Sequence, residues 1–411
     1  MNNNPTASNK KTSKSLMVLL SFLGLYLLST GSSWALFSFL NQEPGSLFSG
    51  NVGDTRSKID LSLPKTEECP INGQMFTEPE RDIWETRRPI TAMIENHEDS
   101  RPLAGLQKAD IVYEAVAEGG VTRHLGIFYC GAAAEDVRIA PIRSARVHFL
   151  SWAAEYGENP IFVHVGGANR ICADCYRGLK PSSQVAPEVD AVGLLIDLGW
   201  RVPGGNDFDT TYDIGYPVLL RDPERLGRPI ATEHTMVGST DAIYNEAIER
   251  GFAYENVDGE VWSTKYVPWT FVDESPLSSA KASQIAFDFW GENNAYSVSW
   301  KYEAAQNLYI RFNGGTQAKD NITGESFTAK NVVVQFVEER GPVDSEKHMF
   351  YKTIGSGDAL VFQNGDVVKA TWEKESISSR TIFSNTDGTE IAFVRGQTWI
   401  EGVPDGNEIA Y

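Results

Sequence analysis

The chain has 411 residues, with 36 Lys and Arg against 55 Asp and Glu, which gives a formal net charge of -19 at pH 7. Nucleic-acid binding depends on clustered basic side chains that neutralise phosphates, so this charge excludes a nucleic-acid partner and argues against adsorption to an anionic lipid surface. Hydrophobic residues make up 41% of the chain, and the length exceeds what one hydrophobic core usually fills, so two domains are expected.

The N-terminus combines a basic stretch with a long uncharged segment. Three lysines lie within residues 10–14, and residues 16–40 contain no charged side chain. A membrane span needs roughly 20 apolar residues, and its basic flank stays inside the cytoplasm. We therefore predict a cytoplasmic tail at 1–15 and a single-pass plasma-membrane helix at 16–40, with the bulk of the chain extracytoplasmic. The alternative is a signal segment cleaved near Ala35, which would give a secreted protein.

The rest of the chain falls into parts of different texture. Residues 41–81 are rich in Pro, Gly and Ser and show little periodicity, so a linker is predicted there. Residues 82–255 mix strand-like and helical segments, whereas residues 256–411 consist of strand-like runs separated by Gly, Asn and Asp turns. The predicted fold class is α+β, with a mixed α/β-layered N-terminal domain followed by a β-rich C-terminal domain and preceded by the membrane segment.

Individual elements can be placed within each domain. In the first domain, strands are predicted over 88–94, 109–117, 121–129 and 160–165, and helices over 144–154 and 240–250. Gly119-Gly120 would connect the second and third strands as a hairpin, and Ser144 would cap the first helix. In the second domain, strands are predicted over 284–289, 296–302, 307–312, 331–337, 359–362, 367–372 and 397–403. Aromatic residues recur there, and their alternation with polar residues favours core packing over a glycan-binding surface.

The four cysteines fit an oxidising compartment. Cys69, Cys130, Cys172 and Cys175 can pair in three ways. The spacing of Cys172 and Cys175 is typical of a redox dithiol only where the pair begins a helix of a thioredoxin-like unit. Because the pair here follows a Gly-Gly segment, a local disulfide that fixes a loop is favoured.

Charged side chains gather at the ends of the predicted strands in the first domain. Period-two counting places Glu114 and Glu118 on one face of their strand. Arg143 and Arg146 are three residues apart, and on one face at a helix N-terminus they would meet backbone N–H groups that favour an anion. We therefore predict a pocket for an anionic cell-envelope ligand. Its predicted binding residues are Arg123, Arg143, Arg146, Glu95 and Asn96.

The sequence does not identify a reaction. It has no nucleophile motif of the Gly-x-Ser-x-Gly type, no phosphate-cradling loop and no dinucleotide fingerprint, so no cofactor is expected. The histidines lack metal-type spacing, so no metal site is expected. If the protein is an enzyme, we expect a hydrolase or transferase acting on an envelope glycan or peptide. The candidate catalytic residues are His164 and His234 as bases, with Glu114 and Glu118. A third hypothesis is a non-catalytic assembly module in which these charges form ion pairs.

Several segments resemble those of the YerB-like lipoprotein family. The resemblance covers roughly residues 88–404 and includes Ile94-Glu-Asn-His97, Arg101-Pro-Leu-Ala-Gly-Leu106, Glu118-Gly-Gly-Val-Thr-Arg123, Pro141-Ile-Arg-Ser-Ala-Arg146 and Gly396-Gln-Thr-Trp-Ile400. It implies an α+β first domain, a β-rich second domain and a membrane-tethered, extracytoplasmic protein whose function is not established. Two features depart from the family: no cysteine near the N-terminal segment can carry a lipid, and residues 231–236 keep His234 but lose the neighbouring Pro and Asn.

Overall fold

The computed structural model describes residues 59–173, 181–256, 258–291 and 293–411, together with positions 18, 20 and 22. The chain divides into two units, Met1–Val52 and Gly53–Tyr411, and the second, the folded unit, contains nearly all of the described residues. The predicted tail and membrane segment lie outside the described residues, apart from those three positions. Among the described residues, none of the helices has the length and apolar character needed to span a membrane.

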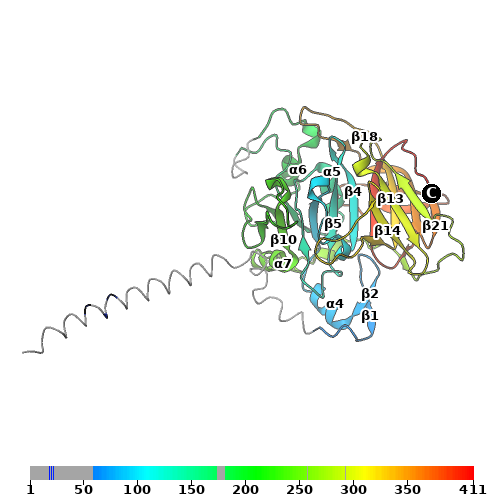
Figure 1. Cartoon of the computed structure of the whole chain (residues 1–411), viewed down its shortest axis with the longest axis horizontal. Coiled ribbons are helices and arrows are strands. Elements are labelled where there is room, and N and C mark those ends of the chain that lie inside the picture. Colours follow the sequence, from blue (N-terminus) through cyan, green and yellow to red (C-terminus); the bar gives the residue numbers. More distant parts are fainter. Residues whose placement is uncertain are drawn as a thin grey trace, which may run out of the picture. The chain divides into compact units, whose positions relative to one another are not determined.

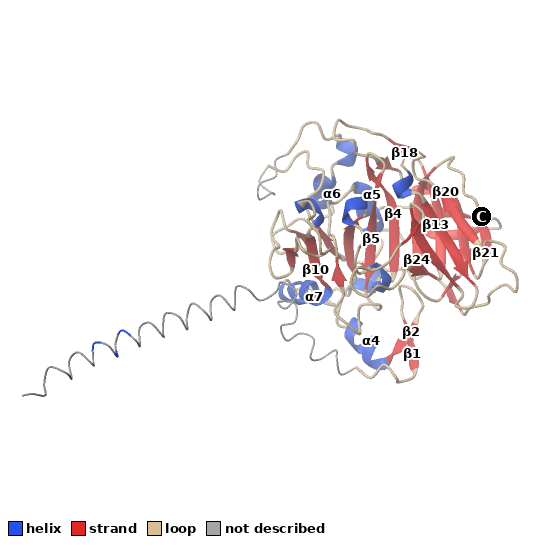
Figure 2. Cartoon of the chain, in the orientation of Figure 1, coloured by secondary structure: helices blue, strands red, loops and turns tan. Residues whose placement is uncertain are grey.

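A ten-stranded mixed sheet runs through the folded unit (Figures 1 and 2). It takes strands from both predicted domains, and the two sets meet where β24 pairs in parallel with β4. Backbone hydrogen bonds therefore join the two domains that were predicted to meet at 255/256. In sheet order the strands are β22 (Ile382–Asn385), β21 (Asp366–Lys374), β20 (Gly355–Gln363), β17 (Asn331–Val337), β24 (Thr398–Pro404), β4 (Ile111–Glu118), β5 (Val121–Phe128), β3 (Ile90–Glu95), β7 (Ile161–His164) and β8 (Asp207–Asp209).

The central strands are apolar because both of their faces are covered. β17 has the sequence Asn-Val-Val-Val-Gln-Phe-Val, and β-branched side chains of this kind suit a pleated, buried surface. On one side it pairs in parallel with β24 and on the other side antiparallel with β20. The predicted strands at 331–337 and 397–403 thus correspond to the middle of the sheet.

A second sheet packs against the C-terminal half of the first. Trp300 from this sheet meets Trp399 of β24 with ring centroids 5.1 Å apart, and both side chains are fully buried. The aromatic residues at these positions are core residues, as the alternation predicted. The strands of the second sheet are β12 (Gln284–Phe287), β13 (Val298–Glu303), β14 (Leu308–Asn313), β15 (Thr316–Gln317) and β16 (Thr328–Ala329).

Shorter sheets and helices complete the described part of the chain. One further sheet has three strands, β6 (Arg138–Ile139), β10 (Met236–Ser239) and β9 (Leu219–Arg221). Three strand pairs complete the described strands: β1 (Lys65–Glu68) with β2 (Met75–Thr77), β11 (Phe271–Val272) with β23 (Phe393–Val394), and β18 (Glu339–Arg340) with β19 (Phe350–Tyr351). The α-helices are α4 (Glu78–Trp84), α5 (Val147–Ala153), α6 (Ala191–Asp197) and α7 (Thr240–Glu249). The 3₁₀ turns are η1 (Glu98–Ser100), η2 (Leu106–Lys108), η3 (Pro187–Val189), η4 (Thr232–His234), η5 (Trp262–Lys265) and η6 (Asn294–Tyr296).

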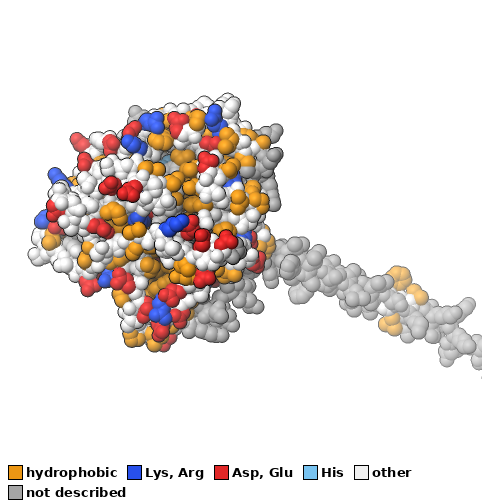
Figure 3. Space-filling model, turned by 180° about the vertical axis from the view of Figure 1, so that it is seen from behind, with side chains coloured by type: hydrophobic (Ala, Val, Ile, Leu, Met, Phe, Trp, Pro, Cys, Tyr) orange, Lys and Arg blue, Asp and Glu red, His pale blue; other side chains and the backbone are white. Residues whose placement is uncertain are grey.

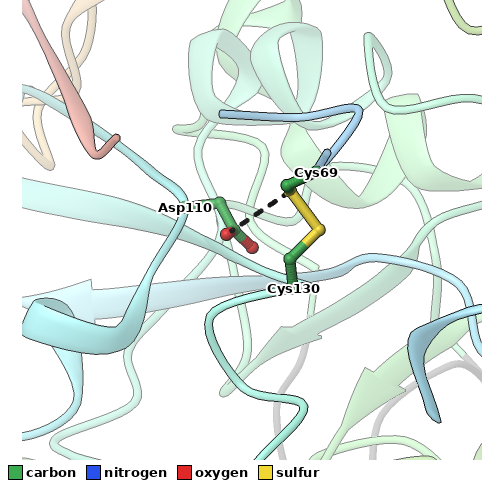
Figure 4. A group of neighbouring side chains, drawn as sticks. All are labelled: Cys69, Asp110 and Cys130. Atoms are coloured by element: carbon green, nitrogen blue, oxygen red, sulfur yellow. Dashed lines mark hydrogen bonds between the residues drawn. A yellow bond between two sulfur atoms is a disulfide. The ribbon is translucent and has the colours of Figure 1, made fainter. Parts of the chain in front are cut away.

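Part of the stretch predicted as linker belongs to the folded unit. Residues 65–81 form β1, β2 and the start of α4, and Ile71 is fully buried. Cys69 is joined to Cys130 by a disulfide, beside the buried carboxylate of Asp110 (Figure 4). The sequence did not show this because the apolar residues of the stretch follow neither a helical nor a strand period. The predicted pair Cys172–Cys175 includes Cys175, which lies outside the described residues.

The Cys69–Cys130 bond should stabilise the unit by restricting the unfolded chain. The two cysteines are 61 positions apart, and a disulfide that closes a loop of this size contributes about 2–4 kcal/mol. We expect the full chain with Cys69→Ala and Cys130→Ala to lose that amount in urea unfolding. Wild-type protein in dithiothreitol should lose at least that amount, because the reductant also reaches the disulfide of Cys172. An unfolding free energy that is unchanged in both experiments would contradict this role.

Candidate functional site

Three charged side chains form a closed cluster beside the turn between β4 and β5. Glu118 accepts hydrogen bonds from Arg123 Nη2, and from Arg146 through Nε at 3.0 Å and Nη2 at 2.7 Å. Arg123 also donates to the carbonyl oxygen of Ser144 at 2.9 Å, and Arg146 donates to that of Ala145 at 2.7 Å. Both arginine side chains are buried. One carboxylate therefore balances two guanidinium groups, whose donors are largely occupied by protein acceptors.

The electrostatics of this cluster follow from its burial. Burial alone would raise the pKa of Glu118, but Arg123 and Arg146 outweigh it and hold the pKa at about 2. Burial, with the neighbouring charge of Arg146, lowers the pKa of Arg123 to about 9. At neutral pH the cluster is therefore ionised and carries an excess of positive charge.

A β-bulge decides which groups Glu118 meets. The pairing of β4 with β5 shifts between Val116 and Glu118, where β4 contains one extra residue. Period-two counting placed Glu114 and Glu118 on one strand face, and this was wrong. Glu118 contacts Arg123, whereas Glu114 accepts a hydrogen bond from Thr122 at 2.6 Å. The bulge thus separates the two carboxylates into different networks.

Glu95 links Arg143 to His234 at the end of β3. Its two carboxylate oxygens contact Arg143 Nε at 3.0 Å and His234 Nδ1 at 2.7 Å. Glu95 and Arg123 are opposite each other in the pairing of β3 with β5, so this group adjoins the Glu118 cluster. The side chain of Arg143 is 26% exposed, and its terminal nitrogens have no protein partner among the described residues. Arg143 is thus the arginine of the predicted pocket that remains open to a ligand.

The segment that carries Arg143 is extended rather than helical. α5 begins at Val147, and its N-cap Arg146 has extended backbone angles (φ -137°, ψ 148°). The backbone amide of Arg143 instead donates to the carbonyl oxygen of Met93 on β3 at 3.0 Å. The predicted helix start at Ser144, and with it the shared helix face of the two arginines, was therefore wrong. Hydrogen bonding to the neighbouring strand holds residues 143–146 extended, and this tertiary constraint is not visible in local sequence.

Asn96 and Glu114 belong to a second, fully buried network. One oxygen of Glu114 accepts from Asn96 Nδ2 at 3.0 Å and from Thr122 Oγ1. Its other oxygen lies 3.2 Å from His124 Nε2 and also pairs with Arg311 of the second sheet. Asn96 and Glu114 are 1% and 0% exposed, so neither can touch a ligand from solvent in this conformation.

Arg311 joins this network to Glu401 on β24. It donates to Glu401 through Nη1 at 2.5 Å and also pairs with Glu114, while its guanidinium carbon lies 4.7 Å from the ring centroid of Trp399. Burial raises the pKa of Glu401 to about 7, because Arg311 offsets burial only in part and the Glu114 carboxylate raises the pKa further. Burial opposes ionisation of Glu114 as well, yet Arg311 and His124 hold its pKa at about 2. Below neutral pH, therefore, Glu114 is ionised and Glu401 is mostly protonated, so the two carboxyl groups around Arg311 carry one negative charge between them.

His164 lies in a separate buried ion network. Its Nε2 lies 2.5 Å from Asp207 Oδ1, and its Nδ1 lies 2.8 Å from the carbonyl oxygen of Gly166. Arg201 bridges Asp207 and Asp209 at 2.5 and 2.6 Å. His164 is fully buried; burial alone would lower its pKa, but the two aspartates raise it. Both ring nitrogens are occupied, so His234 is the better placed of the two candidate bases.

Comparisons with known proteins agree with the fold. The chain matches the model "Protein of unknown function (DUF3048) N-terminal domain" over residues 76–192 and the model "Protein of unknown function (DUF3048) C-terminal domain" over residues 285–400. The chain belongs to this family. The resemblance stated from the sequence is therefore confirmed, including the order of the two family domains.

A protein from Bacillus subtilis is similar along most of the chain in both sequence and structure. The "Putative lipoprotein YerB" of strain 168 is 27% identical over 356 residues, which cover 86% of this chain and 89% of the relative. The crystal structure of the YerB protein from Bacillus subtilis matches with a TM-score of 0.63 and 25% identity, covering 84% of this chain and all of that chain.

Sequence reasoning missed several residues of these networks. Arg311 and Glu401 come from the second domain and were not singled out, although Arg311 occupies an inward position of β14 where an apolar residue is expected. A charged residue at a core position of an alternating strand is the signal that identifies such a group. His97 was singled out only as lacking metal-type spacing. In the structure its ring stacks on that of His234, with centroids 5.1 Å apart.

Glu118 should stabilise the fold by compensating two arginines. Removing its charge leaves both uncompensated, so we expect Glu118→Gln to cost about 2–3 kcal/mol at pH 7, less than a fully buried pair because the side chain is 28% exposed. Because the folded pKa lies below the free value, the wild-type advantage should shrink as pH falls from about 4.5 towards 2. The control Glu246→Gln breaks one helix pair with Arg250 and should cost less than about 0.5 kcal/mol. Equal costs for the two variants would contradict this account.

Glu401 should make the protein less stable as pH rises. Its folded pKa is about 7, above the free value near 4.5, so the folded state retains a proton that the unfolded chain releases between these pH values. We expect Glu401→Gln to exceed wild type by about 1–3 kcal/mol at pH 8, and the difference to disappear by about pH 4.5. Urea unfolding across this range measures it, with the exposed Glu408→Gln as control. A Gln variant that is less stable than wild type at pH 8 would show that the folded protein favours the ionised form of Glu401, and would contradict the raised pKa.

Proposed function

We propose that this is a membrane-associated extracytoplasmic protein that binds an anionic cell-envelope ligand at Arg143. The observation that carries the proposal is that this arginine is only partly hydrogen-bonded within the described part of the chain. One nitrogen, Nε, is fixed by Glu95, and the two terminal nitrogens remain available on a partly exposed side chain. An arginine held on one side presents a preorganised planar fork to a carboxylate or phosphate.

The surrounding charges support an anion at this position. Arg123 and Arg146 lie behind Arg143, and the three arginines outnumber Glu95 and Glu118. Glu233 also interacts with Arg143, so the positive excess is confined to the three arginines and the two carboxylates that they contact. On the face shown in Figure 3 acidic and basic side chains are interspersed. Arg123 and Arg146 would act by their charge, because Glu118 and two backbone carbonyl oxygens occupy most of their donors.

The cellular location rests on the relative and on the sequence. The Bacillus subtilis relative is named a putative lipoprotein, and lipoproteins are tethered to a membrane by a lipid. This chain has no cysteine near its N-terminal apolar segment, so we propose that the uncharged segment at 16–40 provides the attachment as a single-pass helix.

A catalytic role is the second candidate, and it depends on His234. Glu95 binds its Nδ1 at 2.7 Å, which leaves Nε2 as the free nitrogen of an oriented imidazole. A carboxylate–histidine pair of this kind is the usual arrangement of a general base. No Ser, Thr or Cys side chain in the described part of the chain hydrogen-bonds to the ring of His234, so ligand binding is the stronger proposal.

The test compares Arg143→Gln with a matched arginine. Arg395→Gln removes an arginine of similar side-chain exposure, 24%, that also pairs with carboxylates. Thermal unfolding of the full chain is followed with inorganic phosphate, glycerol phosphate and N-acetylmuramic acid as probes. A probe at a hundred times its dissociation constant should stabilise wild type and Arg395→Gln by about 2.7 kcal/mol and leave Arg143→Gln unchanged.

The outcome also separates the alternatives. No shift with any probe in wild type would contradict anion binding and favour the non-catalytic assembly module. A shift of equal size in Arg143→Gln would place the ligand elsewhere on the protein.

A further inference from the structure

Three side chains with metal-binding atoms meet beside Arg143. His97 follows β3, Asp99 lies in η1, and His234 ends η4, yet one ligand atom from each lies within 4.8 Å of the other two. His97 Nδ1 and Asp99 Oδ2 are 3.8 Å apart. Two ligands of one tetrahedral zinc ion are separated by about 3.4 Å, because each lies about 2.1 Å from the metal. The one measured pair exceeds this spacing by a few tenths of an ångström, and the stacked rings of His97 and His234 must turn for both to direct a nitrogen at one ion.

The group is open to solvent on one side and fixed on the other. The side chains of His97 and Asp99 are 34% and 71% exposed, so both can adjust to an ion and exchange it with solvent. His234 is 7% exposed and is held from behind by Glu95. One buried ligand with two adjustable ones gives a site that is anchored without being closed.

Glu95 binds His234 in the way that a carboxylate commonly binds a metal-ligating histidine. Its carboxylate accepts from His234 Nδ1 at 2.7 Å, so the proton resides on that nitrogen and the lone pair of Nε2 faces away from Glu95. Metal-binding histidines usually donate their second nitrogen to a carboxylate in this way, which orients the ring and raises its basicity. Glu95 is itself fixed by Arg143 at 3.0 Å. This second contact is independent of the three-residue group.

The charges around the group accommodate a cation. Arg143 lies beside it, and Arg228 donates to the carbonyl oxygen of Asp99 at 2.7 Å. The carboxylates of Glu95 and Asp99 offset these two positive charges, and Glu233, next to His234, adds a further negative charge. Ion binding also requires one exchange, because His97 Nδ1 now accepts from the backbone amide of Asp99 at 3.2 Å. That bond is long and partly exposed, so its loss costs little.

We propose that His97, Asp99 and His234 bind a divalent transition-metal ion of the zinc class, with Glu95 orienting His234. Two imidazoles and one carboxylate suit zinc and its neighbours in the first transition row. Three protein ligands leave at least one coordination position open. An anion in that position would lie next to Arg143, and this part of the inference rests on the proposed anion binding. The ion and the arginine would then hold the same carboxylate or phosphate.

The first experiment measures metal binding alone. The full chain is stripped with EDTA and titrated with Zn²⁺ by calorimetry, and with Co²⁺ by its visible absorption. We expect one ion per chain in wild type and at least about tenfold weaker binding in His97→Gln, Asp99→Asn and His234→Gln. Asp387→Asn, an exposed aspartate outside the group, is the matched control and should bind as wild type does. Asp99→Asn remains informative if a histidine variant fails to fold, because its side chain lies at the surface.

Two results would overturn the site. The first is the absence of Zn²⁺ and Co²⁺ binding in wild type, and the second is equal affinity in wild type and in Asp99→Asn and His234→Gln. Glu95→Gln tests the positioning role separately, since it should weaken Zn²⁺ by about ten- to a hundredfold while one ion still binds.

The second experiment separates the metal site from the anion site. Inorganic phosphate is titrated into wild type and Arg143→Gln, each with Zn²⁺ and with EDTA. Tighter phosphate binding with Zn²⁺ in wild type supports a shared ligand. Zn²⁺ binding without phosphate binding would overturn the proposed function and leave the metal site standing. Phosphate binding that is unaffected by EDTA or by His234→Gln would overturn the link between the two.

Discussion

The pairing of Arg311 with Glu114 and Glu401 holds the two halves of the molecule in register. Glu114 and Glu401 are opposite each other on β4 and β24, and Arg311 reaches them from the second sheet. A buried arginine between two carboxylates gains little net stability, because all three groups lose their hydration. Its value lies in specificity, since a shift of β24 by one residue would leave these charges unpaired.

The network around Arg311 also fixes the end of β3, from which Glu95 of the candidate site projects. Asn96 donates to Glu114 and accepts from Arg101 Nε at 3.0 Å, and Arg101 donates to the carbonyl oxygen of Ala295 at 2.7 Å. Glu95, the preceding residue, turns to the other face and binds Arg143. Consecutive residues at the end of β3 therefore serve different purposes: Asn96 connects the strand to the second half, and Glu95, itself buried, holds the partly exposed side chain of Arg143. A substitution in the C-terminal half could alter the site through this connection without touching it.

Much of the fold could be predicted from the sequence because local sequence patterns indicate most of its strands. The strands at 90–95, 111–118, 121–128 and 331–337 were predicted within a few residues, since β-branched runs bounded by Gly or polar turns indicate a strand without tertiary information. The start of α5 was misplaced because a hydrogen bond to Met93 on a neighbouring strand, rather than local propensity, keeps residues 143–146 extended.

The candidate site was predicted in part for similar reasons. The gathering of Arg123, Arg143 and Arg146 with Glu95 was visible because all lie at predicted strand or helix ends. The bulge that separates Glu114 from Glu118 was not visible, since a single inserted residue leaves no mark in the alternation of so apolar a strand. The approach of His234 to His97 depends on a chain reversal far along the sequence, and no spacing rule covers such a pair.

The central position of β24 has a consequence for the way the protein is made. Every other strand of the large sheet precedes β24 in the chain, yet β24 lies between β17 and β4. A nascent chain grows from its N-terminus, so the edge of β4 that pairs with β24 has no partner until β24 is made. Its backbone amides and carbonyls remain unpaired until then. A waiting strand edge of this kind readily recruits a neighbouring chain and leads to aggregation. The growing polypeptide is thus exposed to edge-to-edge pairing at β4 until β24 has been added.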